Sequence, residues 1–336
     1  MQQDRILLAH GSGGTMMRDL IEEVFVADFG DAALERLDDA AVVEAPAKRL
    51  AFSTDTYVVT PLEFPGGDIG RLAVCGTVND VATAGAVPLY LSVGFVLEEG
   101  LPLDLLRRIL ASMRDAAAEA GVRIVTGDTK VVERGHGDGM YVNTAGVGVV
   151  RDGVDLSGSY CRPGDVVLLS GTIGDHGIAV VSVREGLAFS TEVISDAAPL
   201  GALVHAVLDA APATRCFRDP TRGGLASTLN ELARASGVGI VVDEAKVPVR
   251  EQVRGACEML GYDVYQVANE GKMVAVVPPE QAEAALEAMR QAPYGADAAA
   301  IGTVTEGPAG RVHVQTPFGA TRVMDMLVGE QLPRIC

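Results

Sequence analysis

The chain has 336 residues and a formal charge of -18, from 27 basic and 45 acidic side chains. This charge argues against nucleic acid or an anionic membrane as the main partner, because both repel an acidic surface. Hydrophobic residues make up 48% and charged residues 21%, which is typical of a globular protein long enough for two domains.

The five cysteines are odd in number and include no CxxC pair. Neither a disulfide framework nor a structural zinc site is therefore expected. The first residues, MQQDRILLAHGSGG, contain no secretory apolar region, and no apolar run in the sequence reaches membrane-spanning length. We therefore expect a cytoplasmic protein with reduced thiols and no membrane partner.

A glycine-rich loop follows the apolar run 6–9 and leads into a helix that is expected to start near residue 15. Backbone N–H groups of such a loop can wrap phosphate groups. The loop matches neither GxGxxG nor a Walker A pattern, and a flexible N-terminal turn is the alternative. The loop residues are Gly11, Ser12, Gly13 and Gly14.

Short apolar runs alternate with amphipathic segments through both halves of the chain, which predicts an α/β fold for each half. Strands are expected at 50–56, 88–96, 122–126, 140–150, 165–170, 239–242, 264–268, 273–277, 299–304 and 312–316. Helices are expected at 68–84, 102–120, 200–210, 225–235, 250–260, 280–290 and from 178 onward. The polar, glycine-rich segment 152–162 predicts a boundary, giving domains 1–152 and 153–325 and a tail, 326–336.

Acidic residues recur at or near the ends of apolar elements in the first half: Asp38, Asp39, Asp55, Asp80 and Asp128. Hard oxygen ligands of this kind suit Mg²⁺ with nucleotide phosphates, and Lys130 can neutralise phosphate charge. In the second half, Asp219 precedes a Gly-Gly pair that opens a helix, a place where an anion can rest. Glu270 and Lys272 suit a charged pair in a cleft, with surface ion pairs as the alternative.

The chain ends on Pro333, Arg334, Ile335 and Cys336. A thiolate is the most nucleophilic ordinary side chain, and on a terminus it can be loaded in one place and processed in another. The alternative is that the chain simply stops on a cysteine. The ten residues from 327 span roughly 30 Å when extended, enough to reach from a domain edge into a cleft. His176, by contrast, is expected to be structural rather than catalytic.

The motifs HGSGG, LDDAAVV, STDT, VND, GDTKV, GTIGDHG, RDPTRGG, NEGK and the terminal PRIC cover essentially the whole chain. This ordered set resembles the HypE family of hydrogenase maturation proteins, the carbamoyl dehydratases. VND, GDTK and the glycine-rich start are shared with a wider ATP-binding superfamily that includes aminoimidazole ribonucleotide synthetase and selenophosphate synthetase. The resemblance implies an N-terminal α/β domain that dimerises through its sheet, an α/β C-terminal domain and a mobile tail.

The resemblance also implies an activity. A partner carbamoyltransferase, HypF, would load a carbamoyl group onto Cys336, and ATP with Mg²⁺ would dehydrate it to a thiocyanate. The cyano group would pass to iron held by HypC–HypD. Glu270 is expected to be the base for the N–H proton, with Lys130 stabilising the oxygen or phosphate. The Mg²⁺ group would be Asp38, Asp55, Asp80 and Asp128, and ATP would also contact the glycine-rich loop, Asn143 and Asp219.

Three other functions are compatible with parts of this pattern. A selenophosphate synthetase would carry a cysteine or selenocysteine near the glycine-rich loop, but residues 8–15 contain none. A thiamin-phosphate kinase would need no terminal thiol. A non-catalytic scaffold that only presents Cys336 would need no acid set of the Mg²⁺ type.

Overall fold

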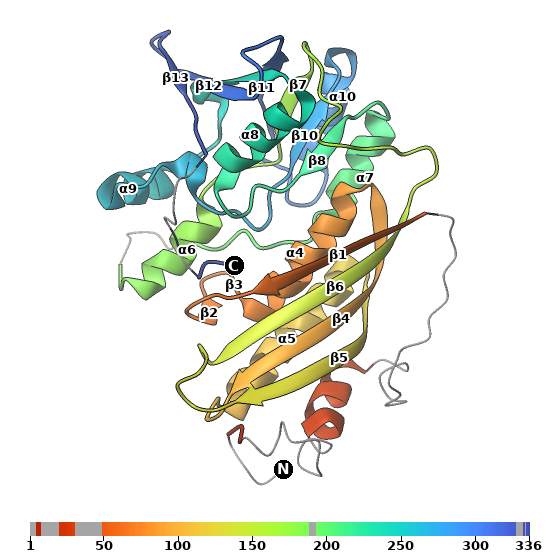
Figure 1. Ribbon diagram of the computed structural model, residues 1–336, viewed down its shortest axis with the longest axis vertical. Coiled ribbons are helices and arrows are strands. Elements are labelled where there is room, and N and C mark those ends of the chain that lie inside the picture. The colour runs from red at the N-terminus through yellow and green to blue at the C-terminus, as the bar shows by residue number, and fades with distance from the viewer. Residues whose placement is uncertain (1–4, 8–19, 31–48, 188–192, 327–331, 333) are drawn as a thin grey trace.

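The computed structural model describes the chain except for residues 1–4, 8–19, 31–48, 188–192, 327–331 and 333. Two large β-sheets follow one another along the chain and lie toward opposite ends of its long axis, with the C-terminus between them (Figure 1). Within the described part, no helix is long and apolar enough to cross a membrane.

The first half forms a four-stranded sheet in the order β1 (Leu50–Tyr57), β6 (Met140–Val150), β4 (Ala86–Glu98) and β5 (Arg123–Val132). The β1–β6 and β6–β4 pairs are antiparallel, and the β4–β5 pair is parallel. Helices α4 (Ile69–Thr83) and α5 (Leu103–Ala120) cover one face (Figure 1). The helical segments η2 (Ile21–Val26) and α2 (Ala27–Phe29) precede this sheet, and the hairpin of β2 (Glu63–Phe64) and β3 (Gly67–Asp68) leads into α4.

Local sequence explains where helix α4 begins and where helix α5 ends. The Asp68 carboxylate accepts the N–H groups of Gly70 and Arg71 at 2.7 and 2.9 Å, so it caps the start of α4. Helix α5 ends at Gly121, whose φ of 69° lies in the left-handed region that favours glycine. Its buried side repeats at helical spacing: Leu106, Ile109, Leu110 and Met113.

The second half forms a seven-stranded sheet in the order β13–β12–β9–β11–β7–β10–β8, and only the β12–β9 pair is parallel. Helix α8 packs on one face, and α7 and α10 pack on the other. The strands are β7 (Val166–Leu169), β8 (Cys216–Arg218), β9 (Gly239–Asp243), β10 (Val274–Val277), β11 (Ala299–Thr305), β12 (Arg311–Gln315) and β13 (Thr321–Val323). The helices are α6 (Asp175–Arg184), α7 (Gly201–Ala210), α8 (Gly224–Ser236), α9 (Glu251–Leu260) and α10 (Ala282–Gln291), with short 3-10 turns η3 (Glu244–Lys246), η4 (Val264–Gln266) and η5 (Pro279–Gln281).

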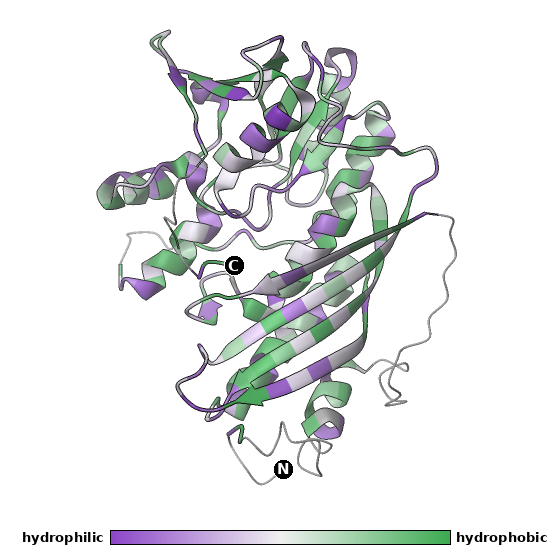
Figure 2. Ribbon diagram, in the orientation of Figure 1, coloured by the Kyte–Doolittle hydropathy of each residue, from purple (hydrophilic) through white to green (hydrophobic). Residues whose placement is uncertain are grey.

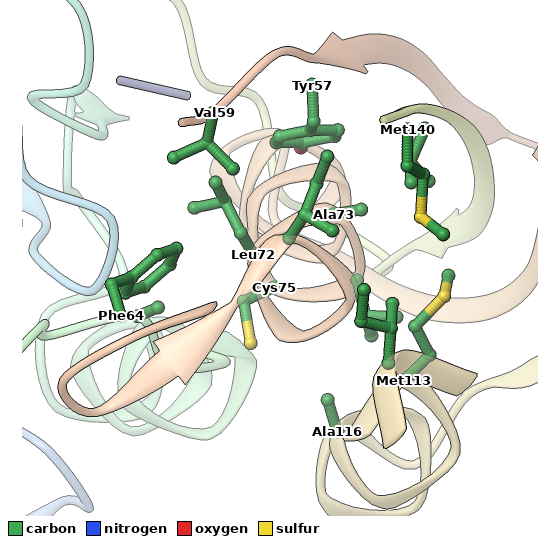
Figure 3. Close-up of a cluster of buried hydrophobic side chains, with 14 of the residues drawn as sticks. Tyr57, Val59, Phe64, Leu72, Ala73, Cys75, Met113, Ala116 and Met140 are labelled. Atoms are coloured by element: carbon green, nitrogen blue, oxygen red, sulfur yellow. The ribbon is translucent and has the colours of Figure 1, made fainter. Parts of the chain in front are cut away.

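The apolar core under the first sheet continues into the second half of the chain. Figure 3 shows Leu72 of α4 and Met113 of α5 in this cluster, together with Tyr57 of β1. The same cluster includes buried residues of α6 and α9, and it takes in Leu332 and Ile335 of the tail. The last residues of the chain therefore pack between the two halves, where α4 and α5 of the first half meet α6 and α9 of the second. This region is called the seam below.

Most predicted elements are confirmed, and two differ. Residues 264–268 are not a strand, because the segment begins as the 3-10 turn η4, where the Asp263 carboxylate accepts the Tyr265 N–H at 3.1 Å. Strand β5 does not end at residue 126 but continues to Val132, so Asp128 and Lys130 lie within the sheet, paired with β4. The domain bounds 1–152, 153–325 and 326–336 stay a prediction.

Candidate active site

The described end of the tail is docked in the seam. Ile335 forms an antiparallel bridge with Val59, and the Thr60 N–H donates to the Arg334 carbonyl at 3.2 Å. Cys336 is half-buried and packs against the edge of the core cluster. The C-terminus lies near α6 and the β2–β3 hairpin (Figure 1). The described tail residues therefore occupy an inward position between the two halves of the chain.

Glu270 is the acid beside the terminal thiol, and the two side chains are within hydrogen-bonding reach. The Glu270 carboxyl is 3% exposed, and its Oε1 has no hydrogen-bond partner among the described residues. Its backbone N–H donates to Asp196 Oδ1 at 3.0 Å, and Asp196 pairs with Lys272 Nζ at 3.1 Å. This buried ion pair fixes the segment that carries Glu270, while Oε1 of its carboxyl group is buried without a hydrogen-bond partner among the described residues.

Burial and neighbouring carboxylates shift the proton equilibria of this pair. Burial, followed by the charges of Asp219 and Asp196, raises the pKa of Glu270 well above its usual range. Burial, followed by the charge of Glu270, raises the pKa of the Cys336 thiol well above its usual value. The docked thiol is therefore held neutral, and Glu270, once ionised, is a stronger base than an exposed carboxylate.

Three further acids meet near this pair from three separate elements. Asp55 lies on β1, Asp80 on α4, and Asp219 directly after β8. The Ser53 hydroxyl donates to Asp80 Oδ2 at 2.8 Å, and the Arg222 guanidinium lies 3.8 Å from Asp55 Oδ1. Burial, followed by the charge of Asp80, raises the pKa of Asp219 to about 7. Acids crowded in this way favour a bound cation.

Asp128 does not join these acids within one chain. Strand pairing places Thr56, Asn143 and Asp128 in one row across the sheet, whereas Asp55 pairs with Thr144 in the next row. Because successive strand residues point to opposite faces, Asp128 and Asn143 lie on the face opposite to Asp55. Within one chain, Asp128 therefore lies apart from Asp55 and Asp80, and its place in the Mg²⁺ group stays a prediction.

The predicted cation Lys130 shares this opposite face with Asp128. Its Nζ pairs with both carboxylate oxygens of Asp128 at 2.7 Å, and the ion pair is exposed. Hydrogen bonding from Lys130 lowers the pKa of Asp128. The Asn143 amide donates to the Asp55 backbone carbonyl at 2.9 Å and to the Thr56 hydroxyl at 2.8 Å, which ties it to β1.

The remaining predicted site residues lie outside the described part of the chain: Gly11, Ser12, Gly13, Gly14 and Asp38. Among the described residues, no group of three His, Cys, Asp or Glu side chains is arranged to hold a metal ion. Mg²⁺ commonly takes only one or two protein carboxylates and completes its coordination with water and phosphate oxygens. Asp55 and Asp80 fit this mode of binding, with Asp219 beside them.

Sequence reasoning missed two residues of this site. Asp196 supports Glu270 and Lys272, but it lies in a segment for which no element or motif was predicted. His176 was interpreted as structural rather than catalytic, and the sequence did not indicate its contact with the tail, where its Nε2 lies 2.7 Å from the Ile335 carbonyl oxygen. The position of His176 in the GTIGDHG motif at a helix start was the only available signal.

Comparisons with known proteins match both halves of the chain to one family. Residues 37–150 match the family described as AIR synthase related protein, N-terminal domain, and residues 162–315 match the corresponding C-terminal domain. The carbamoyl dehydratase HypE of Azotobacter vinelandii is 56% identical over 336 residues, which is 100% of this chain and 98% of the relative. The carbamoyl dehydratase HypE of Escherichia coli is 46% identical over 338 residues, covering 99% of this chain and 100% of the relative.

Solved structures of HypE proteins also resemble the fold of this chain. A structure of the hydrogenase maturation protein HypE in complex with ATP has a TM-score of 0.95 at 50% identity, covering 98% of this chain and 99% of that one. A HypE–HypF complex has a TM-score of 0.81 at 48% identity, covering 92% of this chain and 99% of that one. A thiamine monophosphate kinase at 19% identity, with a TM-score of 0.60, shares the fold alone. The chain belongs to the HypE family of carbamoyl dehydratases, within the AIR synthase related proteins.

Proposed function

We propose that this chain uses ATP to dehydrate a carbamoyl group carried on Cys336, giving a thiocyanate for the iron of a [NiFe] hydrogenase. The observation that carries the proposal is the docking of a C-terminal thiol against a buried glutamate, Glu270, one of whose oxygens has no partner among the described residues. Asp55, Asp80 and Asp219 lie close enough to raise one another's pKa values or that of Glu270. A binding module that only presented the thiol would need neither feature.

The proposed reaction turns the carbamoyl oxygen into a leaving group. That oxygen attacks the γ-phosphate of ATP, ADP departs, and one of the two N–H protons passes to water, which leaves an imidate-like phosphate on the carbon bound to sulfur. Glu270 then takes the second proton from nitrogen, the carbon–oxygen bond to phosphate breaks, inorganic phosphate leaves, and the C≡N bond of the thiocyanate forms. When bound, Mg²⁺ would offset phosphate charge, and Asp55 and Asp80 would hold it, with Asp219 beside them.

Loading must take place with the tail in another position. The raised pKa of the docked Cys336 thiol makes it a poor nucleophile, because the thiolate is the reactive form. We therefore propose that a carbamoyltransferase of the HypF type meets the tail outside the seam, and that the cyano group leaves the same way for a HypC–HypD acceptor. The solved complex of a HypE relative with HypF supports the first of these partners.

An intact-mass experiment tests the whole proposal. The purified chain is incubated with ATP, Mg²⁺, carbamoyl phosphate and the partner carbamoyltransferase. We expect the C-terminal peptide to gain one carbamoyl group and then to lose one water, the second step only when the ATP is hydrolysable. Consumption of ATP with no change in the mass of this peptide would reject the proposal and favour a small-molecule kinase.

We also propose a homodimer formed through the face of the four-stranded sheet that no described helix covers. The helices α4 and α5 cover the other face (Figure 1), and green bands of apolar residues recur along β4 and β6 between pale and purple bands (Figure 2). Phe52 on β1 is 71% exposed and pairs with Val147 of β6. The side chains of Lys130 and Asp128 project from this face. For them to act on a reacting group, they must therefore enter the active site of the second chain in the dimer.

Phe52→Asp is expected to convert the dimer into a monomer, because a charge would replace an aromatic side chain at a desolvated contact. Sedimentation velocity measures the change directly. Phe318→Asp is the matched control, since Phe318 is 98% exposed and lies between β12 and β13, far along the chain from this sheet. A wild-type chain that sediments as a monomer, or a Phe52→Asp variant that stays a dimer, would contradict this interface.

A further inference from the structure

His176 makes a polar contact with the tail from inside the protein. It lies in the first turn of α6 with an exposed fraction of 0%. Its Nε2 is 2.7 Å from the Ile335 carbonyl oxygen, and its Nδ1 is 2.8 Å from Ser195 Oγ. A carbonyl oxygen only accepts hydrogen bonds, so Nε2 carries the proton and Nδ1 accepts from the Ser195 hydroxyl.

Neighbouring groups hold His176 in this one tautomer. Ser195 Oγ also accepts the Ala197 N–H at 3.2 Å, which directs its own proton toward Nδ1. The Phe64 ring stands edge-on to the imidazole, with centroids 5.4 Å apart and an interplanar angle of 86°. Burial lowers the pKa of His176, against the opposing charge of Asp196, so the ring stays neutral. A neutral, oriented imidazole is what a fixed donor to the tail requires.

The surface around His176 is shaped to receive the tail. Its neighbour Gly177 has no side chain, and a Cβ there would lie 2.4 Å from Val267 Cγ1 and 3.2 Å from Leu332 Cδ1. The Arg334 side chain of the tail makes a contact of a different kind, because it pairs with Asp138 at 3.0 Å on the surface. Exposed pairs of this sort contribute little, whereas a buried carbonyl that loses its donor is costly.

The bonded carbonyl belongs to the peptide unit that carries Cys336. This unit is planar, so fixing the Ile335 oxygen also fixes the direction in which the Cys336 backbone leaves it. The Cys336 side chain then starts from a defined point and reaches Glu270. His176 thus contacts the peptide unit that carries the sulfur, through the Ile335 carbonyl oxygen.

We propose that His176, oriented by Ser195, is a positioning residue for the terminal cysteine, holding the last peptide unit so that a group on the sulfur meets Glu270. The consequence for catalysis rests on the proposed dehydratase function. The consequence for tail docking does not, because it concerns the unmodified chain. The two are therefore measured separately.

Docking is measured by the rate at which iodoacetamide alkylates Cys336 in the full native chain. The other four cysteines are buried, so the C-terminal peptide reports the tail. His176→Leu removes the donor and is expected to raise the alkylation rate about tenfold, the effect of one lost buried hydrogen bond. His176→Gln is expected to restore the wild-type rate, because its amide can donate to the same carbonyl. His313→Leu on β12 is the matched control.

Catalysis is measured as single-turnover water loss from the carbamoylated tail. His176→Leu is expected to lower this rate about tenfold with the KM for ATP unchanged, and His176→Gln to recover it. Ser195→Ala is a smaller change that serves as a second test where His176→Leu fails to fold. It should raise the alkylation rate of Cys336 and lower the rate of water loss, as His176→Leu does. Unchanged alkylation in His176→Leu and Ser195→Ala would overturn the positioning role. Faster alkylation with no water loss in any chain, wild type included, would reject the dehydratase function and leave the positioning role supported.

Discussion

Glu270→Gln is expected to slow the loss of water from carbamoylated Cys336 by about a hundredfold to ten-thousandfold, the range for removal of a general base. The amide has nearly the shape of the carboxyl group it replaces but takes up no proton. Because Glu270 is 3% exposed and its Oε1 has no partner in the described part of the chain, the substitution should leave the fold intact. Rapid-quench sampling followed by intact mass gives the rate of this single step.

The control and the pH profile make this prediction specific. Glu280→Gln makes the same chemical change on an exposed turn and should leave the rate unchanged. A base acts in its ionised form, so the wild-type rate should rise with pH through the raised pKa of Glu270, above the usual carboxyl range. Asp219 and Asp196 contribute to that pKa, so the midpoint belongs to the group of acids. Water loss at near wild-type rate in Glu270→Gln would assign the base to another residue.

Local signals were sufficient for most of the fold. The cap at Asp68, the glycine stop at Gly121 and the helical spacing of apolar residues in α5 are each contained in a few consecutive residues. The 3-10 turn after Asp263 was missed because its apolar residues also fit a short strand. Such runs are ambiguous until the capping carboxylate is seen to bond the backbone.

The candidate site was harder to predict because its geometry depends on contacts between distant residues. Asp128 was grouped with Asp55 by residue type, but the strand register places the two on opposite faces of the sheet. The docking of Ile335 against Val59 and His176 joins positions far apart in the sequence. No local pattern encodes such a pairing, so the sequence predicted Glu270 as the base for the group on Cys336 but not the contacts of the tail with Val59 and His176.

Cys336→Ala is expected to abolish the gain of the carbamoyl group, and with it the loss of water. A methyl group offers no nucleophile, and Cys75, Cys161, Cys216 and Cys257 are buried, so none can substitute for the terminal thiol. Intact mass after incubation with the partner carbamoyltransferase should show no added group. Cys257→Ala is the matched control, because it removes another thiol and leaves the tail intact, and it should be carbamoylated as the wild type is.

The same variant separates the tail reaction from ordinary ATP turnover. If the carbamoyl oxygen is the acceptor of the γ-phosphoryl group, Cys336→Ala lacks the acceptor, and ATP consumption stimulated by carbamoyl loading should fall to the unstimulated level. A kinase that acts on a free small molecule needs no terminal thiol and would continue to consume ATP. Loading of Cys336→Ala at the wild-type level would contradict the assignment of Cys336. Tail-independent ATP consumption would instead place the transferred phosphoryl group on an acceptor other than the tail.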